Sequence, residues 1–132
     1  MFSKLKILLT IFILFELISC KIDYKTNRII GQYTFDTITF NDTNVKGELI
    51  TNTIIFEKNN QIYLPNNINE SNEKKANWSI IEGDLIKIES SNKIFNGNYK
   101  FKYIYDNLKK RHGIELKSKT TQLTIHKLLP SY

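Results

Sequence analysis

The chain of 132 residues carries 19 Lys and Arg against 13 Asp and Glu, and it contains a single Cys. This length allows one domain, and the 41% of hydrophobic residues argues against a wholly disordered chain. The lone Cys excludes an intramolecular disulfide framework and a Cys-based zinc finger. Ala occurs only at Ala76, which argues against an all-helical fold.

The first residues have the pattern of a secretory signal. Lys4 and Lys6 provide a positive start, and residues 7–15 form an uncharged apolar run. This run is shorter than the ~20 residues that a helix needs to span a bilayer. We therefore predict that residues 1–19 are a signal peptide that the mature chain lacks.

The apolar run is followed by Leu17-Ile18-Ser19-Cys20, which resembles the lipobox of bacterial lipoproteins. The resemblance implies that diacylglycerol is attached to the Cys20 thiol, that cleavage follows Ser19, and that the new amine is acylated, with palmitate as a typical chain. Two or more acyl chains anchor a protein stably to a membrane. Lys21 replaces the Asp of many inner-membrane lipoproteins, which implies the outer membrane, facing the periplasm or the cell surface. The alternative is an ordinary secretory signal in which Cys20 falls at this place by chance.

The chain is basic, but the positions of its charges argue against a nucleic-acid partner. Lysines are scattered over the predicted strands and turns, and the only dense cluster lies at residues 109–112 (KKRH). A nucleic-acid site concentrates positive charge on one face and exposes aromatic rings for stacking. We expect a solvated basic surface with a mild attraction to anionic lipid headgroups.

Residues 20–27 are a short polar stretch that suits a tether between the lipidated Cys and a domain. The clearest strand signal beyond it is a period-two pattern over residues 98–105, where only Ile104 interrupts the polar side. This alternation predicts a strand with one buried face. The aromatic residues of that face are Tyr99, Phe101, Tyr103 and Tyr105.

Shorter runs predict the remaining strands. Their apolar members are Tyr33 and Phe35; Ile50, Ile54 and Phe56; Ile62 and Leu64; Trp78 and Ile80; Ile86 and Ile88; Ile114 and Leu116; and Leu123 and Ile125. In the first strand the apolar positions change face between Phe35 and Ile38, which predicts a β-bulge or a sharp bend. Turn-forming residues separate the runs at 58–60, 82–84, 96–98 and 118–120. The only large loop, residues 66–75, has room for a helical turn.

About eight strands therefore follow one another through short links. Consecutive antiparallel neighbours of this kind predict an all-β fold, an up-and-down eight-stranded barrel that is closed or partly open. The predicted domain covers residues 28–128, and residues 129–132 form a tail.

Several motifs resemble those of the lipocalin-like domains found on small bacterial lipoproteins. Residues 31–33 (GQY) stand where lipocalins place Gly-x-Trp, and residues 40–42 (FND) are similar to their Phe-Asn-Asp/Glu turn. Residues 78–85 (WSIIEGDL) are similar to a Trp-x-Ile-x-(Gly/Asn)-x-x-Leu hairpin, followed by 95–99 (FNGNY) and the closing 125–128 (IHKL). The resemblance implies a lipocalin-like barrel and, with it, the carriage of a small ligand.

We predict neither enzyme activity nor a cofactor. Cys20 is used by the lipid, and the sequence contains no Gly-x-Ser-x-Gly, Gly-rich phosphate loop or His-Glu-x-x-His. His112 and His126 would lie close together if the last hairpin turns near Lys119. Because Glu115 is out of phase with both, we predict no metal site.

Two functions remain open at this point. The barrel is either a structural or protein-interaction module for another envelope protein, or it binds or transports a small apolar ligand. An eight-stranded barrel is just wide enough to be filled by side chains or to hold one small ligand. Bulky aromatics favour the filled barrel. The candidate ligand or core aromatics are Tyr33, Phe35, Trp78, Tyr99, Phe101, Tyr103 and Tyr105.

Overall fold

The computed structural model describes residues 3–4, 6–11, 26–68 and 75–128. The chain divides into two units, Met1–Ile30 and Gly31–Tyr132, which are described separately. In the first unit, residues 6–11 and 26–29 are helical. Neither of these helices, nor any other in the described ranges, combines the length and apolar character needed to cross a bilayer.

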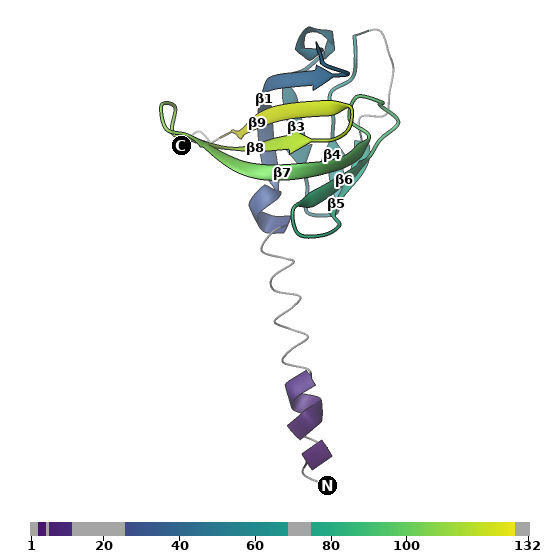
Figure 1. The fold of residues 1–132 in the computed structure, drawn as a ribbon, viewed down its shortest axis with the longest axis vertical. Coiled ribbons are helices and arrows are strands. Elements are labelled where there is room, and N and C mark those ends of the chain that lie inside the picture. The colour runs from purple at the N-terminus through teal and green to yellow at the C-terminus, as the bar shows by residue number, and fades with distance from the viewer. Residues whose placement is uncertain (1–2, 5, 12–25, 69–74, 129–132) are drawn as a thin grey trace. The chain divides into compact units, whose positions relative to one another are not determined.

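The described part of the second unit forms nine β-strands and one short 3-10 helix (Figure 1). Their bounds are β1 Gly31–Phe40, β2 Thr43–Asn44, η1 Lys46–Glu48, β3 Thr53–Phe56, β4 Gln61–Tyr63, β5 Lys75–Ile80, β6 Leu85–Glu89, β7 Gly97–Asp106, β8 Arg111–Lys117 and β9 Thr121–Lys127.

Eight of these strands form one closed antiparallel barrel. β1 pairs with β3, each strand from β3 to β8 pairs with the next in the sequence, and β9 returns to pair with β1. β2 is an additional short strand that pairs only with the end of β1, where Thr39 lies opposite Asn44. The prediction of an all-β, up-and-down eight-stranded barrel is confirmed, and the barrel is closed.

A β-bulge interrupts β1 where the sequence predicted a change of face. Phe35 lies opposite Ile125 of β9, but the next pair is Thr37 with Thr124, so Asp36 is the extra residue. Because Asp36 is an extra residue, the inward-facing positions of β1 shift by one residue at the bulge. Phe35 before it and Ile38 after it are therefore both buried. The predicted bulge is confirmed.

The structure corrects two local predictions. Ile50 was expected in a strand with Ile54, but β3 begins at Thr53, and the side chain of Ile50 is 60% exposed. The turn predicted at residues 96–98 lies earlier in the chain than expected. Gly97 already begins β7, and the turn before it is closed by hydrogen bonds from the backbone of residues 95 and 96 to the Asn92 carbonyl. The other predicted turns link β3 to β4, β5 to β6 and β8 to β9. The helical turn expected within residues 66–75 falls largely on 69–74, outside the described residues.

The core lies inside the barrel and is rich in aromatic rings. Trp78 on β5 is 2% exposed, and its ring meets that of Phe56 on β3 edge-on at 5.1 Å between centroids. Phe56 in turn meets Tyr33 on β1 at 5.7 Å, again edge-on. Edge-to-face pairs at such distances are favourable beyond their buried area. One chain of rings thus joins β1, β3 and β5 across the barrel interior.

Trp78→Ala is predicted to lower the free energy of unfolding by about 3–5 kcal/mol, because it removes a buried ring and leaves a cavity. It also removes the indole N–H that donates to the Glu57 carbonyl at 3.1 Å. A domain of this size has only ~5–15 kcal/mol in total. Urea unfolding followed by far-UV circular dichroism measures the loss. The matched control is Tyr105→Ala at a 49% exposed ring, which is expected to cost less than about 1 kcal/mol. Equal stability of the Trp78 variant and the wild type would contradict the prediction.

Candidate functional site

The aromatic residues predicted as ligand-binding or core residues occupy two different environments. Tyr33, Phe35, Trp78 and Tyr99 are at most 2% exposed and lie in the barrel interior. Phe101 and Tyr103 are half-buried, and Tyr105 is 49% exposed. Alternation places the last three on the same face of β7 as Tyr99, but burial decreases along the strand. The sequence pattern therefore identified the face, while only its first aromatic belongs to the closed core.

The loop between β6 and β7, residues 90–96, covers part of this core. Phe95 is fully buried and its ring lies 6.0 Å from that of Phe35. The loop is held by Asn92, which is 2% exposed and whose side-chain oxygen accepts a hydrogen bond from the Ile94 N–H at 3.1 Å. The Thr121 hydroxyl donates to the Ile94 carbonyl. Sequence analysis found only a turn here and missed the covering role of this loop.

Two of the buried aromatic residues, Tyr33 and Tyr99, carry a hydroxyl group. The Tyr99 hydroxyl donates to the Phe95 carbonyl at 2.7 Å, so the covering loop satisfies it. Burial raises the pKa of Tyr99 to about 12. Burial also raises the pKa of Tyr33, and the nearby hydroxyl of Tyr103 adds to this rise. Both hydroxyls thus stay neutral at physiological pH, and they add no charge to the barrel interior.

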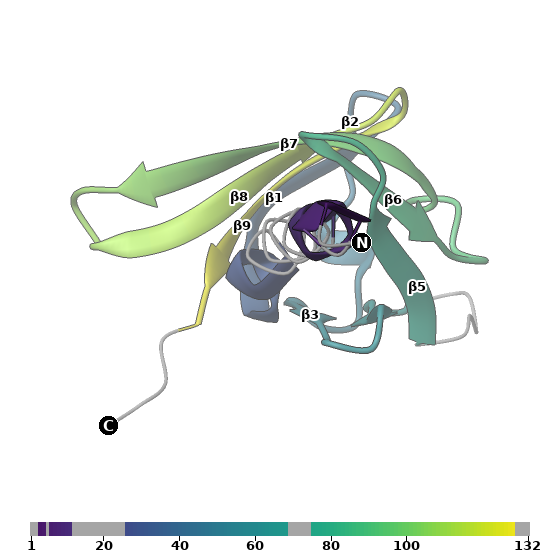
Figure 2. The same cartoon turned by 90° about the horizontal axis from the view of Figure 1, so that it is seen from below.

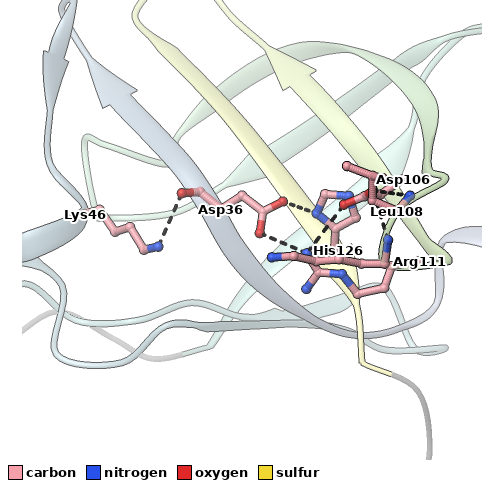
Figure 3. A network of polar contacts seen from close by, with 7 residues as sticks. Asp36, Lys46, Asp106, Leu108, Arg111 and His126 are labelled. Carbon is pink, nitrogen blue, oxygen red and sulfur yellow. Dashed lines mark hydrogen bonds and ion pairs between the residues drawn. The ribbon is translucent and has the colours of Figure 1, made fainter.

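A second group of residues lies on the outer face, around the β1 bulge (Figure 3). Nδ1 of His126 on β9 pairs with Oδ2 of Asp36, and Nη2 of Arg111 on β8 lies 3.7 Å from Oδ1 of the same carboxylate. Arg111 also lies 4.0 Å from Asp106 at the end of β7. Lys46 donates to the Asp36 carbonyl at 3.3 Å. This ionic cluster, defined as Asp36, Asp106, Arg111 and His126, links β1, β7, β8 and β9.

His126 is buried although it lies on the outer face of the barrel, because a glycine lies beside it. Gly113 pairs with His126 on one side and with Ile104 on the other. A Cβ at Gly113 would come within 2.8 Å of the His126 ring and 3.1 Å of Ile104. The two larger side chains thus occupy the space above the glycine, and the His126 side chain is only 7% exposed. Its burial makes the pairing with Asp36 important, since a buried polar nitrogen needs a partner.

Asp106 shapes the turn that follows β7. Its carboxylate accepts the backbone N–H groups of Lys109 at 3.2 Å and Leu108 at 3.0 Å. The bond from Lys109 is the main cause that holds the pKa of Asp106 below its ordinary value, and the positive charge of Arg111 acts in the same direction. The carboxylate therefore remains ionised through the physiological range.

The last hairpin turns near Lys119 as predicted, but His112 and His126 do not come together, because their side chains point to opposite faces of the wall. Because Gly113 lies opposite His126, the preceding His112 points to the other face, where its ring lies 4.8 Å from that of Tyr105. No group of three His, Cys, Asp or Glu suited to a metal ion occurs among the residues for which the structure gives positions. Cys20, the predicted lipidation site, is outside the described residues.

A half-open pocket of about 250 Å³ lies on the outside of the barrel, over β3 and β4. Its lining is mostly apolar and includes Ile50, Thr53, Ile55, Tyr63, Leu64 and Pro65. Ile55 and Tyr63 are neighbours across the two strands and face away from the core. The pocket was not predicted, because the apolar pattern around Ile50 indicates a buried strand.

Asp36→Ala is predicted to lower the free energy of unfolding by about 1–3 kcal/mol, because it leaves the buried His126 nitrogen without a partner. Asp36→Asn keeps an acceptor oxygen and should cost less. The matched control is Glu89→Ala, which breaks the pair with Lys87 at 2.9 Å. Both side chains of that pair are about half exposed, so its loss should cost about 1 kcal/mol at most. Chemical unfolding measures the free energy of unfolding of each variant. If Asp36→Ala lowers it no more than the control does, the cluster is unimportant for stability.

Comparison with known proteins finds no matching family model, no matching curated protein and no matching solved structure. A function for this chain is therefore inferred from its own sequence and structure.

Proposed function

We propose that the protein is a lipid-anchored envelope lipoprotein whose side-chain-filled barrel serves as a structural or protein-interaction module. The observation that carries the proposal is the packing of the barrel interior. The ring of Phe56 contacts those of Tyr33 and Trp78, and Phe95 of the covering loop packs against Phe35. An eight-stranded barrel whose interior is occupied by rings has little room for a ligand.

The outer surface supports the same proposal. The pocket over β3 and β4 is mostly apolar, open to solvent and lined in part by the exposed Ile50, which are properties of a surface that another protein can cover. The ionic cluster around Asp36 fixes the opposite flank of β1 to β9 and β8. In this proposal the barrel is a rigid scaffold, and its exterior makes the functional contacts.

The anchor part of the proposal rests on residues 1–20 of the sequence. An apolar run after two lysines and a Leu-Ile-Ser-Cys motif ending at Cys20 are the features of a lipoprotein signal. Acyl chains on Cys20 would hold the barrel at a membrane surface.

Cys20→Ser is predicted to abolish acylation and to move the protein out of the membrane fraction, because the thiol is the point of lipid attachment. The measurement is incorporation of labelled palmitate together with fractionation in high salt. Lys21→Ser is the matched control, since it changes the next residue and keeps the thiol. A Cys20→Ser chain that stays with membranes as the control does would disprove the lipid anchor.

The domain without residues 1–20 is predicted to take up no apolar fluorescent probe, because rings already fill its interior. Phe35→Ala, which empties space inside the barrel, provides a positive control, since engineered apolar cavities bind small apolar molecules. Saturable one-to-one uptake by the unaltered domain would favour a ligand carrier instead. If uptake is seen, Ile55→Lys distinguishes the two possible places, because it blocks only the outer pocket.

A further inference from the structure

The hairpin of β7 and β8 extends beyond both of its neighbouring strands. β6 pairs with β7 only as far as Lys100, and β9 pairs with β8 only from Gly113 onward. The end of the hairpin, residues 105–112, is here called the β7–β8 arm. Figure 2 shows it projecting at the left, away from the rest of the barrel. Residues of the arm can therefore contact a surface that the barrel wall does not reach.

The tip of this arm has a fixed shape. The Asp106 carboxylate accepts the backbone N–H groups of Leu108 and Lys109, and Lys110 has a positive φ of 51° that turns the chain back into β8. Arg111 lies close to Asp106 and to Asp36 of the ionic cluster. The carboxylates of Asp36 and Asp106 therefore balance the positive charge of Arg111. These contacts hold the turn at the base of the arm.

The surface of the tip combines an apolar side chain with two free positive charges. Leu108 is 96% exposed, more than any other large hydrophobic side chain in the described ranges. Lys109 and Lys110 are exposed, and in the described part of the chain neither lies within ion-pair distance of a carboxylate. Tyr105, 49% exposed, lies at the base of the arm.

We propose that the β7–β8 arm contacts an anionic membrane surface, with Leu108 entering the headgroup region and Lys109 and Lys110 pairing with lipid phosphates. The inference rests on the proposed lipid anchor and adds a second membrane contact to it. Lysines close to an anionic leaflet are attracted to it, and a partly exposed tyrosine suits the interface between water and acyl chains.

The form of the tip favours a membrane over an acidic protein. A stable protein interface buries roughly 800 Å² on each partner and is depleted in Lys at its core. The tip is the end of a two-stranded hairpin, and it offers one large apolar side chain followed by two lysines. A fluid layer of headgroups can accommodate this combination without a matching rigid shape.

The contact is too small to recruit the protein from solution, since even one myristoyl chain binds a membrane only marginally. On an anchored chain the same contact is intramolecular, and a short tether gives it an effective concentration in the range of about millimolar. The arm is therefore expected to orient the barrel on the membrane. The test must measure the depth of the tip in the anchored chain.

The experiment uses the full lipidated chain in vesicles of phosphatidylcholine alone or mixed with phosphatidylglycerol. Asn107→Cys places an environment-sensitive fluorophore at the tip and keeps Leu108. Lys119→Cys, in the turn at the other end of β8, is the matched site. We expect a blue shift and protection from a water-soluble quencher at residue 107 only, and only in the vesicles that contain phosphatidylglycerol.

Two sets of variants test the cause of the protection at residue 107. Lys109→Glu with Lys110→Glu should reduce the protected fraction at least roughly tenfold, because it replaces attraction by repulsion. Leu108→Asn should remove the blue shift. Lys93→Glu with Lys119→Glu changes the net charge equally at exposed sites outside the arm and should leave the protection unchanged. Equal loss in this control would overturn the assignment of the contact to the tip.

Equal quenching at residues 107 and 119 in both kinds of vesicle would overturn the proposal, and it is the result expected if the tip binds an acidic protein instead. The number of fluorophores attached to each chain shows separately whether the anchor is present. One label per chain shows that the Cys20 thiol is blocked, whereas two labels show that it is free and disprove the anchor. Because the arm contact depends on the anchor, two labels per chain overturn both proposals, whereas one label per chain with equal quenching at residues 107 and 119 overturns only the proposal for the arm.

Discussion

Pairing between β1 and β9 turns the sheet into a barrel, and most other features of the structure depend on it. Without this pairing both strands would be open edges with unpaired backbone groups, which favours association with other chains. The bulge at Asp36 lets β1 place Phe35 and Ile38 in the core while it stays paired with β9. The same extra residue supplies the carboxylate that binds His126 across the seam. Closure, core packing and the ionic cluster thus meet at one position.

Closure also determines what kind of function the barrel can have. A closed small barrel points half of its strand residues inward, and large rings at those positions leave the outside to make contacts. The exterior is not uniform. It is apolar over β3 and β4, where the pocket lies, whereas the far end of β7 and β8 is positively charged. In the proposed membrane-anchored module, these two regions would face a protein partner and a lipid surface respectively.

Local pattern was sufficient to predict the fold because each strand has one apolar face. The alternation over residues 98–105 predicted β7, and the change of face after Phe35 predicted the bulge. Alternation says which way a side chain points, but it contains no information on how far the neighbouring strand extends. This is why Tyr105 was grouped with Tyr99, although β6 ends its pairing at Lys100 and leaves Tyr105 half exposed.

The contacts around Asp36 could not be predicted for a related reason. Asp36 and His126 are ninety residues apart in the sequence, and they meet only because β9 closes onto β1. The covering loop depends on a hydrogen bond that the Asn92 side chain accepts from Ile94 and on one that Thr121 donates, and no short motif predicts either. Ile50 was misassigned because an apolar residue near a strand looks like part of it, whereas the backbone N–H of Ile50 bonds to the Asn66 carbonyl instead.

Gly113 shows how little freedom the closed wall leaves to its sequence. A Cβ at this position would stand 2.4 Å from the backbone oxygen of Ile125, a distance that no rotation of a side chain can relieve. Even alanine would push β8 and β9 apart next to the seam. Since glycine alone fits, a mutational scan of this wall should tolerate no other residue here, while the neighbouring outward positions Glu115 and Lys117 accept many. The missing Cβ at Gly113 thus marks a position at which substitution is not compatible with the closed barrel.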